Sequence, residues 1–276
     1  MDRILILGAR GQIGRLLLPA FPGLEVRGIG RPDVDLRDRA SLDRAVNDFN
    51  PDAVVCAAGL ADADYCEEHP AEAYAVNIDG ARHAAQAARG RPFVIFSTDH
   101  VFDGRGGPYA EEDAPNPLSV YGRTKLEMER VVLTIHAKSL VIRTSIVYSG
   151  DDRSFFTRLL KGSDPVPCWT DQTGTPTWGP MLAEATAELV LAGRTGLLHV
   201  AGTERLSRHE FALKTARRFG LDPSRFTPCL LRDAPPRAPR PLSAGLRTEL
   251  AGRVLRMKLL SVDESLEIAY RSHGQP

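Results

Sequence analysis

Short apolar segments alternate with helical segments along the first half of the chain, and this alternation limits the fold more than any other feature. Residues 4–7, 24–30, 52–59 and 93–97 are strand-like, and segments with helical spacing of apolar residues separate them. Repeats of strand, helix and strand form parallel sheets that are covered by helices on both faces. The sequence therefore predicts an α/β fold built on a doubly wound, Rossmann-like parallel sheet.

Length, charge and cysteine content narrow the class of protein. With 276 residues, the chain can form one large α/β core, or a core with a smaller lobe. Its 35 basic residues balance 35 acidic ones, which disfavours nucleic acid and anionic membranes as partners. Four widely spaced cysteines without a CxxC pair favour reduced thiols. Reduced thiols lead us to expect a cytoplasmic protein, and the apolar N-terminal run is too short to span a membrane.

Neither the histidines nor the acidic residues predict a metal site. The seven histidines include no HxxxH pair, which is a common spacing of zinc ligands on a helix. The acidic run Glu111, Glu112 and Asp113 is interpreted as a solvated loop. No metal is therefore expected.

Three glycines, Gly8, Gly11 and Gly14, follow the first predicted strand in the segment LGARGQIG. Glycine lets the backbone turn sharply and approach a diphosphate, whose charge then meets the N–H groups at the start of the next helix. The spacing GxxGxxG is a variant of the dinucleotide fingerprint, and a plain tight turn is the alternative. The position at the first strand–helix junction favours a dinucleotide site.

The predicted strands and helices divide the chain into two parts, since their rhythm breaks after Tyr148. Segments spaced by proline and glycine follow, and a strand near residues 196–202 is expected to return to the first core. We expect a dinucleotide-binding domain and a smaller C-terminal substrate lobe. The first comprises residues 1–148 together with 179–202, and the second comprises residues 149–178 and 203–276.

The residues after the second predicted strand bear on which dinucleotide binds. An acidic residue there suits the ribose 2'-hydroxyl of NAD, whereas arginine suits the 2'-phosphate of NADP. Arg31 follows Gly30, and Arg10 lies in the glycine turn. NADPH is therefore favoured, with NADH as the other option and a solvated loop charge as the alternative role for Arg31. Asp35 and Leu36 suit a pocket for the adenine.

A hydroxyl, a phenol and an amine follow the strand at residues 93–97. Thr98 lies where that strand ends, at the edge of the sheet where doubly wound folds bind ligands. Tyr121 and Lys125 are four residues apart on a helix and share a face. We expect the ammonium to lower the phenol pKa and the threonine to hold a carbonyl group against the phenol. Singly, the three residues have ordinary roles as a cap, a half-buried aromatic and a helix charge, but together they favour catalysis.

Longer motifs extend this pattern, including STDHVFDG (97–104), VYGRTKLEME (120–129) and DQTGTPT (171–177). On these motifs the whole chain resembles the extended short-chain dehydrogenase/reductase family, and within it the dTDP-4-dehydrorhamnose reductases. The combination of STDxVFDG with VYGxTKLxxE is highly specific. The resemblance implies an enzyme that uses NADPH to reduce a nucleotide-activated 4-keto sugar.

The resemblance also assigns roles to residues. It implies Thr98, Tyr121 and Lys125 as the catalytic residues, and Asn77 as a residue that orders the lysine and a water. For the cofactor it implies Gly8, Gly11, Gln12, Ile13, Asp35, Leu36, Ala57, Ala58, Gly59, Tyr121 and Lys125. The glycine turn and the basic residues near it add Gly14, Arg10 and Arg31 to the predicted cofactor site. For the substrate it implies Thr98, His100, Ile146 and Gln172. Trp169, Asp171, Thr175, Pro176 and Trp178 are further candidates for shaping the pocket, with core packing as the alternative for both tryptophans.

Three positions depart from the usual pattern of the family. Cys56 stands where asparagine is usual, His100 where tyrosine is usual, and Ile146 where tryptophan is usual. Because the last two positions face the sugar in relatives, a second function stays open. It is a non-catalytic NADP-binding regulatory subunit resembling the β-subunit of methionine adenosyltransferase. The sequence also leaves open whether the protein forms a homodimer.

Overall fold

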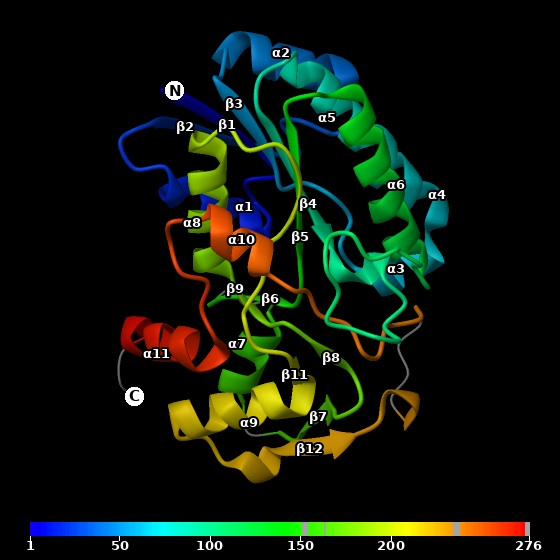
Figure 1. The fold of residues 1–276 in the computed structure, drawn as a ribbon, viewed down its shortest axis with the longest axis vertical. Helices are drawn as coiled ribbons and strands as arrows, with labels where there is room; N and C mark the ends of the chain where they lie inside the picture. Colours follow the sequence, from blue (N-terminus) through cyan, green and yellow to red (C-terminus); the bar gives the residue numbers. More distant parts are fainter. Residues whose placement is uncertain (151–153, 163, 234–237, 274–276) are drawn as a thin grey trace.

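A six-stranded parallel sheet forms the centre of the molecule (Figure 1). The computed structural model describes residues 1–150, 154–162, 164–233 and 238–273, so the remaining residues of the predicted substrate lobe lie outside the described part. The strand order is β10-β5-β4-β3-β1-β2. The strands are β1 (Arg3–Leu7), β2 (Glu25–Ile29), β3 (Ala53–Cys56), β4 (Phe93–Thr98), β5 (Ser139–Thr144) and β10 (Gly196–His199). The predicted doubly wound α/β fold is confirmed.

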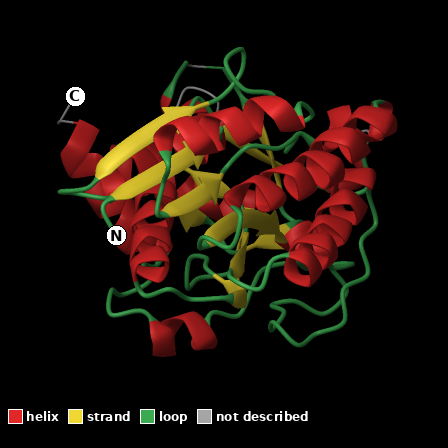
Figure 2. Cartoon of the chain, turned by 90° about the horizontal axis from the view of Figure 1, so that it is seen from above, coloured by secondary structure: helices red, strands yellow, loops and turns green. Residues whose placement is uncertain are grey.

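Helices cover both faces of this sheet (Figure 2). Alternate residues of β1 point to opposite faces, so Ile4 and Ile6 join one apolar cluster while Leu5 and Leu7 join the other. The first cluster includes residues of α1 (Gln12–Leu17), α8 (Gly179–Leu191) and α10 (Glu249–Val254). The second includes residues of α2 (Arg39–Phe49), α5 (Ala81–Ala88) and α6 (Val120–Ile135). Burial on both faces explains why the strands have continuous apolar sequences.

The helical stretch predicted near residues 71–88 contains a wider turn in its middle. It starts as α4 (Pro70–Tyr74), continues as a π-helical turn (Ala75–Gly80) and ends as α5. Asn77 lies in that turn and is buried. Single π-helical turns occur often at functional sites.

The remaining described elements form a lobe below the sheet in Figure 1. Short strands pair within it and beside it, β6 with β9, β7 with β12 and β8 with β11. The helices here are α7 (Phe155–Leu160), α9 (Arg208–Phe219) and α11 (Val262–His273), whereas α3 (Ala63–Glu68) lies beside the sheet. The strands are β6 (Val147–Tyr148), β7 (Val166–Trp169), β8 (Thr173–Gly174), β9 (Thr177–Trp178), β11 (Leu206–Ser207) and β12 (Phe226–Cys229).

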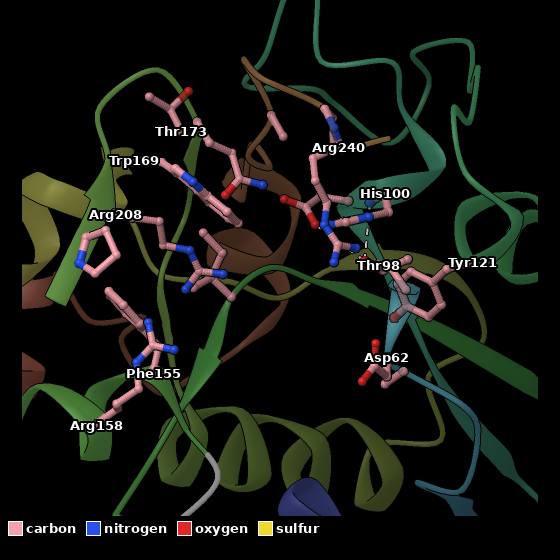
Figure 3. Close-up of a pocket in the computed structure, with 18 residues that line it drawn as sticks. Asp62, Thr98, His100, Tyr121, Phe155, Arg158, Trp169, Thr173, Arg208 and Arg240 are labelled. Carbon is pink, nitrogen blue, oxygen red and sulfur yellow. Dashed lines mark hydrogen bonds between the residues drawn. The ribbon is translucent and has the colours of Figure 1, made fainter. Parts of the chain in front are cut away.

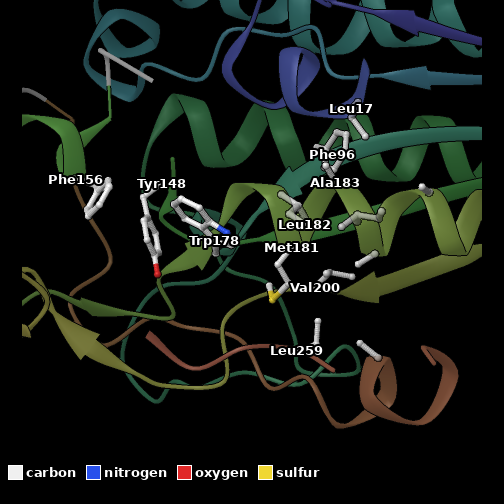
Figure 4. Close-up of a cluster of buried hydrophobic side chains, with 14 of the residues drawn as sticks. Leu17, Phe96, Tyr148, Phe156, Trp178, Met181, Leu182, Ala183, Val200 and Leu259 are labelled. Carbon is white, nitrogen blue, oxygen red and sulfur yellow. The ribbon is translucent and has the colours of Figure 1, made fainter. Parts of the chain in front are cut away.

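The core continues from the sheet into this lobe (Figure 4). Tyr148, Phe156 and Trp178 belong to the same apolar cluster as Leu17 and Phe96 on the sheet side. The Trp178 side chain is buried, with its ring centroid 5.3 Å from that of Tyr148. Of the two roles considered for Trp178, the structure therefore supports core packing.

Some of the C-terminal residues pack against the sheet. Ala251 of α10 belongs to the cluster that covers the α1 face, and α10 contacts strand β10 of the sheet. None of the helices in the described part of the chain is long and apolar enough to cross a membrane.

A buried ion pair attaches α6 to the neighbouring strand β5. Arg143 Nε and Nη2 donate to the two carboxylate oxygens of Glu129 at 2.9 and 2.7 Å, and both side chains are about 4% exposed. Ser97 of β4 also donates to this carboxylate, and Arg143 Nη1 lies 3.4 Å from His199 Nε2 of β10. One carboxylate of α6 is thereby linked to three adjacent strands.

We expect Arg143→Met to lower the free energy of unfolding by about 3–5 kcal/mol, because it leaves the Glu129 carboxylate buried without its partner. A Glu129→Leu, Arg143→Met double variant should lose less than the two single variants together. Urea unfolding measures both. Arg271→Met, which removes an exposed pair with Glu267, is the control and should change little. An Arg143→Met protein as stable as the wild type would contradict the role of the pair.

Candidate active site

The start of α6 fits closely against the loop that follows β4. Ser119 caps the helix by accepting a hydrogen bond from Gly122 N at 3.1 Å. A Cβ atom on Gly122 would lie only 2.2 Å from the carbonyl oxygen of His100, so glycine is required for this approach. The close approach brings Tyr121 to the end of β4, where Thr98 lies.

Tyr121, Lys125 and Glu129 are spaced four residues apart and form one stripe of α6 that faces the sheet. Lys125 Nζ donates to the carbonyl oxygen of Phe96 at 2.6 Å. Burial lowers the pKa of Lys125 to about 8, while the nearby Cys56 and Glu129 side chains oppose this shift. The amine is therefore fixed inside the protein with a pKa close to neutral pH.

The pKa of the Tyr121 phenol is shifted in the opposite direction from that of Lys125. Burial raises the pKa of Tyr121 to about 12, and the carboxylate of Asp99 adds to the rise. The expectation that Lys125 lowers this pKa is wrong for the structure as it stands, because the amine is bonded to Phe96 and burial dominates. The phenol is consequently protonated at neutral pH and available as a proton donor.

Thr98 and His100 lie next to this phenol (Figure 3). Thr98 lines the same two cavities as Tyr121, and its side chain opposes the rise in the Tyr121 pKa. The His100 ring meets the Tyr121 ring edge-on, with the ring centroids 5.5 Å apart. Burial lowers the pKa of His100 despite the opposing charge of Asp99, and Arg240 lowers it further. The His100 ring is therefore neutral at neutral pH. Its Nδ1 atom is buried without a partner among the described residues.

Three adjoining cavities follow the carboxyl edge of the sheet. We call them the glycine-turn cavity (about 390 Å³), the middle cavity (about 240 Å³) and the large cavity (about 560 Å³). The first two share Ala57, Ala58, Gly59 and Leu60, and the last two share Ala61, Thr98, Tyr121 and Ile146. They lie at the divergence of β1 and β3, the point where ligands bind in open α/β sheets.

Most of the predicted site residues line these cavities. The glycine-turn cavity is lined by Gly8, Arg10, Gly11, Arg31, Asp35, Leu36, Ala57, Ala58 and Gly59. The middle cavity is lined by Gln12, Ile13, Ala57, Ala58, Gly59, Thr98, Tyr121, Lys125 and Ile146, and also by Cys56. The large cavity is lined by Thr98, His100, Tyr121, Ile146, Gln172 and Trp169.

Gly14, Asn77 and the further candidates Asp171, Thr175, Pro176 and Trp178 line none of the three cavities. A Cβ atom on Gly14 would lie 2.1 Å from the carbonyl oxygen of Gly8, so Gly14 permits the close packing of α1 on the turn. Asn77 accepts from Leu60 N at 2.8 Å, and its Nδ2 donates to the Leu60 carbonyl oxygen and to Thr124 at 3.0 and 3.1 Å. These contacts fix the loop after β3 to α6, and none of them is to Lys125.

Charged groups at the glycine-turn cavity bind one another. Arg10 donates to the carbonyl oxygen of Arg31 at 2.8 Å and to the Asp33 carboxylate at 3.1 Å. Asp35 binds Arg37 at 2.7 Å, and this hydrogen bond lowers the pKa of Asp35 to about 2. The Arg10 contacts hold the two predicted arginines beside each other.

Three arginines of the large cavity are not among the residues predicted from the sequence. Arg158, Arg208 and Arg240 line it, together with Phe155, on which Arg158 and Arg208 stack (Figure 3). Burial lowers the pKa of Arg208 to about 10, which leaves it charged at neutral pH. The three arginines come from separate segments of the chain, so no sequence spacing could have revealed them.

The acidic run at residues 111–113 differs from the solvated loop that was expected. The Glu111 carboxylate accepts a hydrogen bond from His199 N at 2.9 Å and is mostly shielded from solvent, whereas Glu112 and Asp113 are exposed. Across the described ranges, no group of three His, Cys, Asp or Glu side chains is arranged to hold a metal ion.

The fold, the glycine turn and the Thr98, Tyr121 and Lys125 arrangement define an oxidoreductase of the extended short-chain dehydrogenase/reductase type. Residues 1–273 match the model of the family described as RmlD substrate binding domain. The chain belongs to that family.

Curated relatives and solved structures agree with this membership. A dTDP-4-dehydrorhamnose reductase of Mycolicibacterium smegmatis is 34% identical over 97% of this chain and 85% of the relative. The crystal structure of the dTDP-4-dehydrorhamnose reductase of Bacillus anthracis in complex with NADP superposes with a TM-score of 0.93, at 25% identity over 98% of this chain and 99% of that one. The crystal structure of a dTDP-4-dehydrorhamnose reductase from Clostridium acetobutylicum gives a TM-score of 0.91, at 32% identity over 97% of this chain and 98% of that one.

The pKa of Lys125 predicts a pH dependence of stability. An ordinary lysine titrates near 10.5, so between pH 8 and 10.5 the unfolded chain binds the proton that the folded protein has released. Stability should therefore rise with pH across this window, by about 1.4 kcal/mol per pH unit at most. Urea unfolding from pH 7.5 to 9.5 should show this rise for the wild type relative to Lys125→Met. Parallel stability curves would contradict the lowered pKa.

Proposed function

We propose that the protein is an NADPH-dependent reductase of a dTDP-linked 4-keto sugar, with dTDP-4-dehydrorhamnose as the first substrate to test. The observation that carries the proposal is the join between the middle and large cavities, where Thr98 and Tyr121 line both. The relatives named above are reductases of this substrate, and one of them was solved with NADP. The regulatory-subunit alternative rests on His100 and Ile146, whereas the presence of Thr98, Tyr121 and Lys125 together favours the enzyme.

The glycine-turn and middle cavities fit a nicotinamide dinucleotide. A Cβ atom on Gly8 would lie 2.6 Å from Ala58 N. The chain after β1 and the chain after β3 therefore come close together at Gly8, where no side chain would fit. Arg10 and Arg31 are the candidates for a 2'-phosphate, while Asp35 and Leu36 are candidates for the adenosine. In the middle cavity, Thr144 Oγ1 is buried without a partner among the described residues and can accept or donate a hydrogen bond. When bound, the cofactor supplies a hydride.

The large cavity fits a sugar nucleotide in its charged and aromatic lining. Arg158 and Arg208 lie away from Tyr121 in Figure 3, on the side where Phe155 and Trp169 also lie. Guanidinium groups bind phosphate oxygens with charge-assisted hydrogen bonds, and the two aromatic rings offer faces for a base. We therefore propose that the diphosphate binds on this side, which leaves the sugar beside Tyr121.

The chain's own part in the reaction is a proton transfer. Tyr121, kept protonated by its raised pKa, gives its hydroxyl proton to the oxygen of the reduced keto group. Lys125 provides a cation in the middle cavity, where a cofactor ribose would lie. Thr98 fixes the position of the reacting groups, and Asn77 keeps the loop after β3 against α6. His100, Ile146 and Gln172 contact the sugar from the large cavity.

We also propose how the chain divides into a cofactor-binding and a substrate-binding part, where the protein is located and that it forms a homodimer. We propose that residues 1–148 with 179–202 bind the cofactor, and that residues 149–178 with 203–276 provide most of the substrate contacts. The glycine-turn cavity supports this, since residues from 7 to 76 alone line it. A cytoplasmic location is supported by the four free cysteines, and a homodimer is a further prediction.

We expect Arg31→Ala to weaken NADPH binding by about tenfold while changing NADH binding little, because a charge-assisted contact with the 2'-phosphate is lost. Fluorescence titration with both cofactors measures the ratio. Arg82→Ala is a matched control, since Arg82 pairs with Asp79 on the surface outside all three cavities. Equal losses for both cofactors would show that Arg31 does not select between them.

The decisive test is oxidation of NADPH by the wild-type protein with dTDP-4-dehydrorhamnose and other nucleotide 4-keto sugars. Tyr121→Phe should lower kcat by about 10²–10⁴-fold with near-normal NADPH binding, since it removes the proton donor. Tyr74→Phe removes the hydroxyl of an exposed tyrosine and should behave as wild type. A Tyr121→Phe protein with normal turnover would refute the assigned role, and no turnover by the wild type would refute the function.

A further inference from the structure

The loop after β2 pairs an aspartate of the glycine-turn cavity with an arginine outside the cavity lining. Arg37 Nη2 donates to Asp35 Oδ2 at 2.7 Å, and Arg37 Nε lies 3.1 and 3.2 Å from the two carboxylate oxygens. The backbone N–H of Arg37 also donates to Oδ1, at 2.9 Å. Asp35 lines the cavity, whereas Arg37 does not. A carboxylate of the cavity wall is therefore bound on both oxygens by one residue behind it.

A carboxylate at this place has opposite effects on the two nicotinamide dinucleotides. Its oxygens can accept hydrogen bonds from the adenosine ribose of NADH, whereas its charge repels the 2'-phosphate of NADPH. A phosphate monoester carries a charge of about −1.5 to −2 at pH 7, so an unpaired carboxylate nearby disfavours it. A bidentate guanidinium offsets this charge and uses the oxygens that would accept from the ribose. The partner of Asp35 therefore affects the choice of cofactor.

The other charged groups of this loop leave one arginine available for a phosphate. Arg10 is bound to the Asp33 carboxylate at 3.1 Å, as Arg37 is to Asp35. Arg31 acts on Asp35 through space, and among the described residues its guanidinium has no hydrogen-bonded carboxylate. Each of the two aspartates thus has an arginine partner, and the charge of Arg31 is not used by either of them.

We propose that Arg37 is a positioning residue for cofactor choice, which favours NADPH by pairing with the Asp35 carboxylate, so that this carboxylate neither repels the 2'-phosphate nor binds the ribose hydroxyls. The proposal rests on the proposed binding of NADPH in the glycine-turn cavity. It leaves the phosphate itself to Arg31 and Arg10, while Arg37 acts through Asp35. The Glu72 carboxylate also acts on Arg37 through space, which helps to keep the guanidinium charged.

Titration of the ligand-free protein with NADPH and with NADH tests the proposal without any keto sugar. Arg37→Ala should lower the preference for NADPH over NADH by about three- to tenfold at low salt, since the freed carboxylate of Asp35 then repels the 2'-phosphate. The readout is the ratio of the two dissociation constants, because a contact with the adenine would change both constants alike. An unchanged ratio in Arg37→Ala would overturn the proposal.

A double-mutant cycle distinguishes action through Asp35 from direct contact between Arg37 and the phosphate. Asp35→Asn keeps the shape of the side chain without its charge, so this variant should still prefer NADPH. In that background, Arg37→Ala should change the ratio by less than about twofold. A loss in the Asp35→Asn background equal to the loss in the wild type would show that Arg37 binds the phosphate itself, and would overturn the proposal.

Two further measurements separate charge from local packing. Arg37→Lys keeps the positive charge, although not the bidentate contact, and should keep more of the preference for NADPH than Arg37→Ala does. The side chains of Asp35 and Arg37 are 31% and 46% exposed. Salt ions screen such charges, so the effect of Arg37→Ala should shrink at about 0.5 M salt. A loss that is the same for both variants and at both salt concentrations would overturn the electrostatic role.

The matched control is Arg39→Ala. Arg39 binds Asp43 at 2.9 Å in a pair of similar exposure, and neither residue lines any of the three cavities. This variant should keep the wild-type ratio. An equal loss in Arg39→Ala would show that removing any arginine from this region lowers the preference, and would overturn the specific role of Arg37.

The binding ratio separates this proposal from the proposed function. If the wild type reduces no keto sugar but the ratio falls in Arg37→Ala, the proposed reaction fails while the role of Arg37 stands. If the wild type reduces a keto sugar with NADPH but the ratio is unchanged in Arg37→Ala, the proposed function stands while the role of Arg37 is overturned.

Discussion

The attachment of α6 to the central sheet is the constraint on which the rest of the site depends. Arg143 and Ser97 bind the Glu129 carboxylate from β5 and β4, and one turn earlier Lys125 binds the backbone of β4. Because these contacts are buried, they cannot be exchanged for water without a large loss of free energy. The position of Tyr121 relative to Thr98 follows from them.

Burial of the same contacts also explains the proton chemistry. Removing groups from water disfavours their charged forms, so the pKa of Lys125 falls to about 8 while that of Tyr121 rises to about 12. Each shift favours the neutral form of its group, the amine of Lys125 and the phenol of Tyr121. In the active site, a protonated phenol and a cation with an accessible pKa suit a reaction that needs a proton at neutral pH.

The departures from the family pattern lie at the cavity wall. Ile146 lines both the middle and the large cavity and has a positive φ of 44°, which is rare for a β-branched residue. Gly174 makes room for it, because a Cβ atom there would lie 2.6 Å from Ile146 Cδ1. Unusual backbone angles of this kind often occur at functional sites. Ile146 and His100 thus line the cavity that we propose for the sugar.

The sequence by itself determined the parallel sheet, the glycine turn and the spacing of Tyr121 and Lys125, because strand and helix periodicity and four-residue spacing are local properties. The cavity-lining positions of most predicted residues also follow from motifs within single strand–helix junctions. Only the tertiary structure decided the pKa directions of Tyr121 and His100, since burial depends on neighbours from distant segments. The same holds for the arginines of the large cavity, which come from separate segments of the chain.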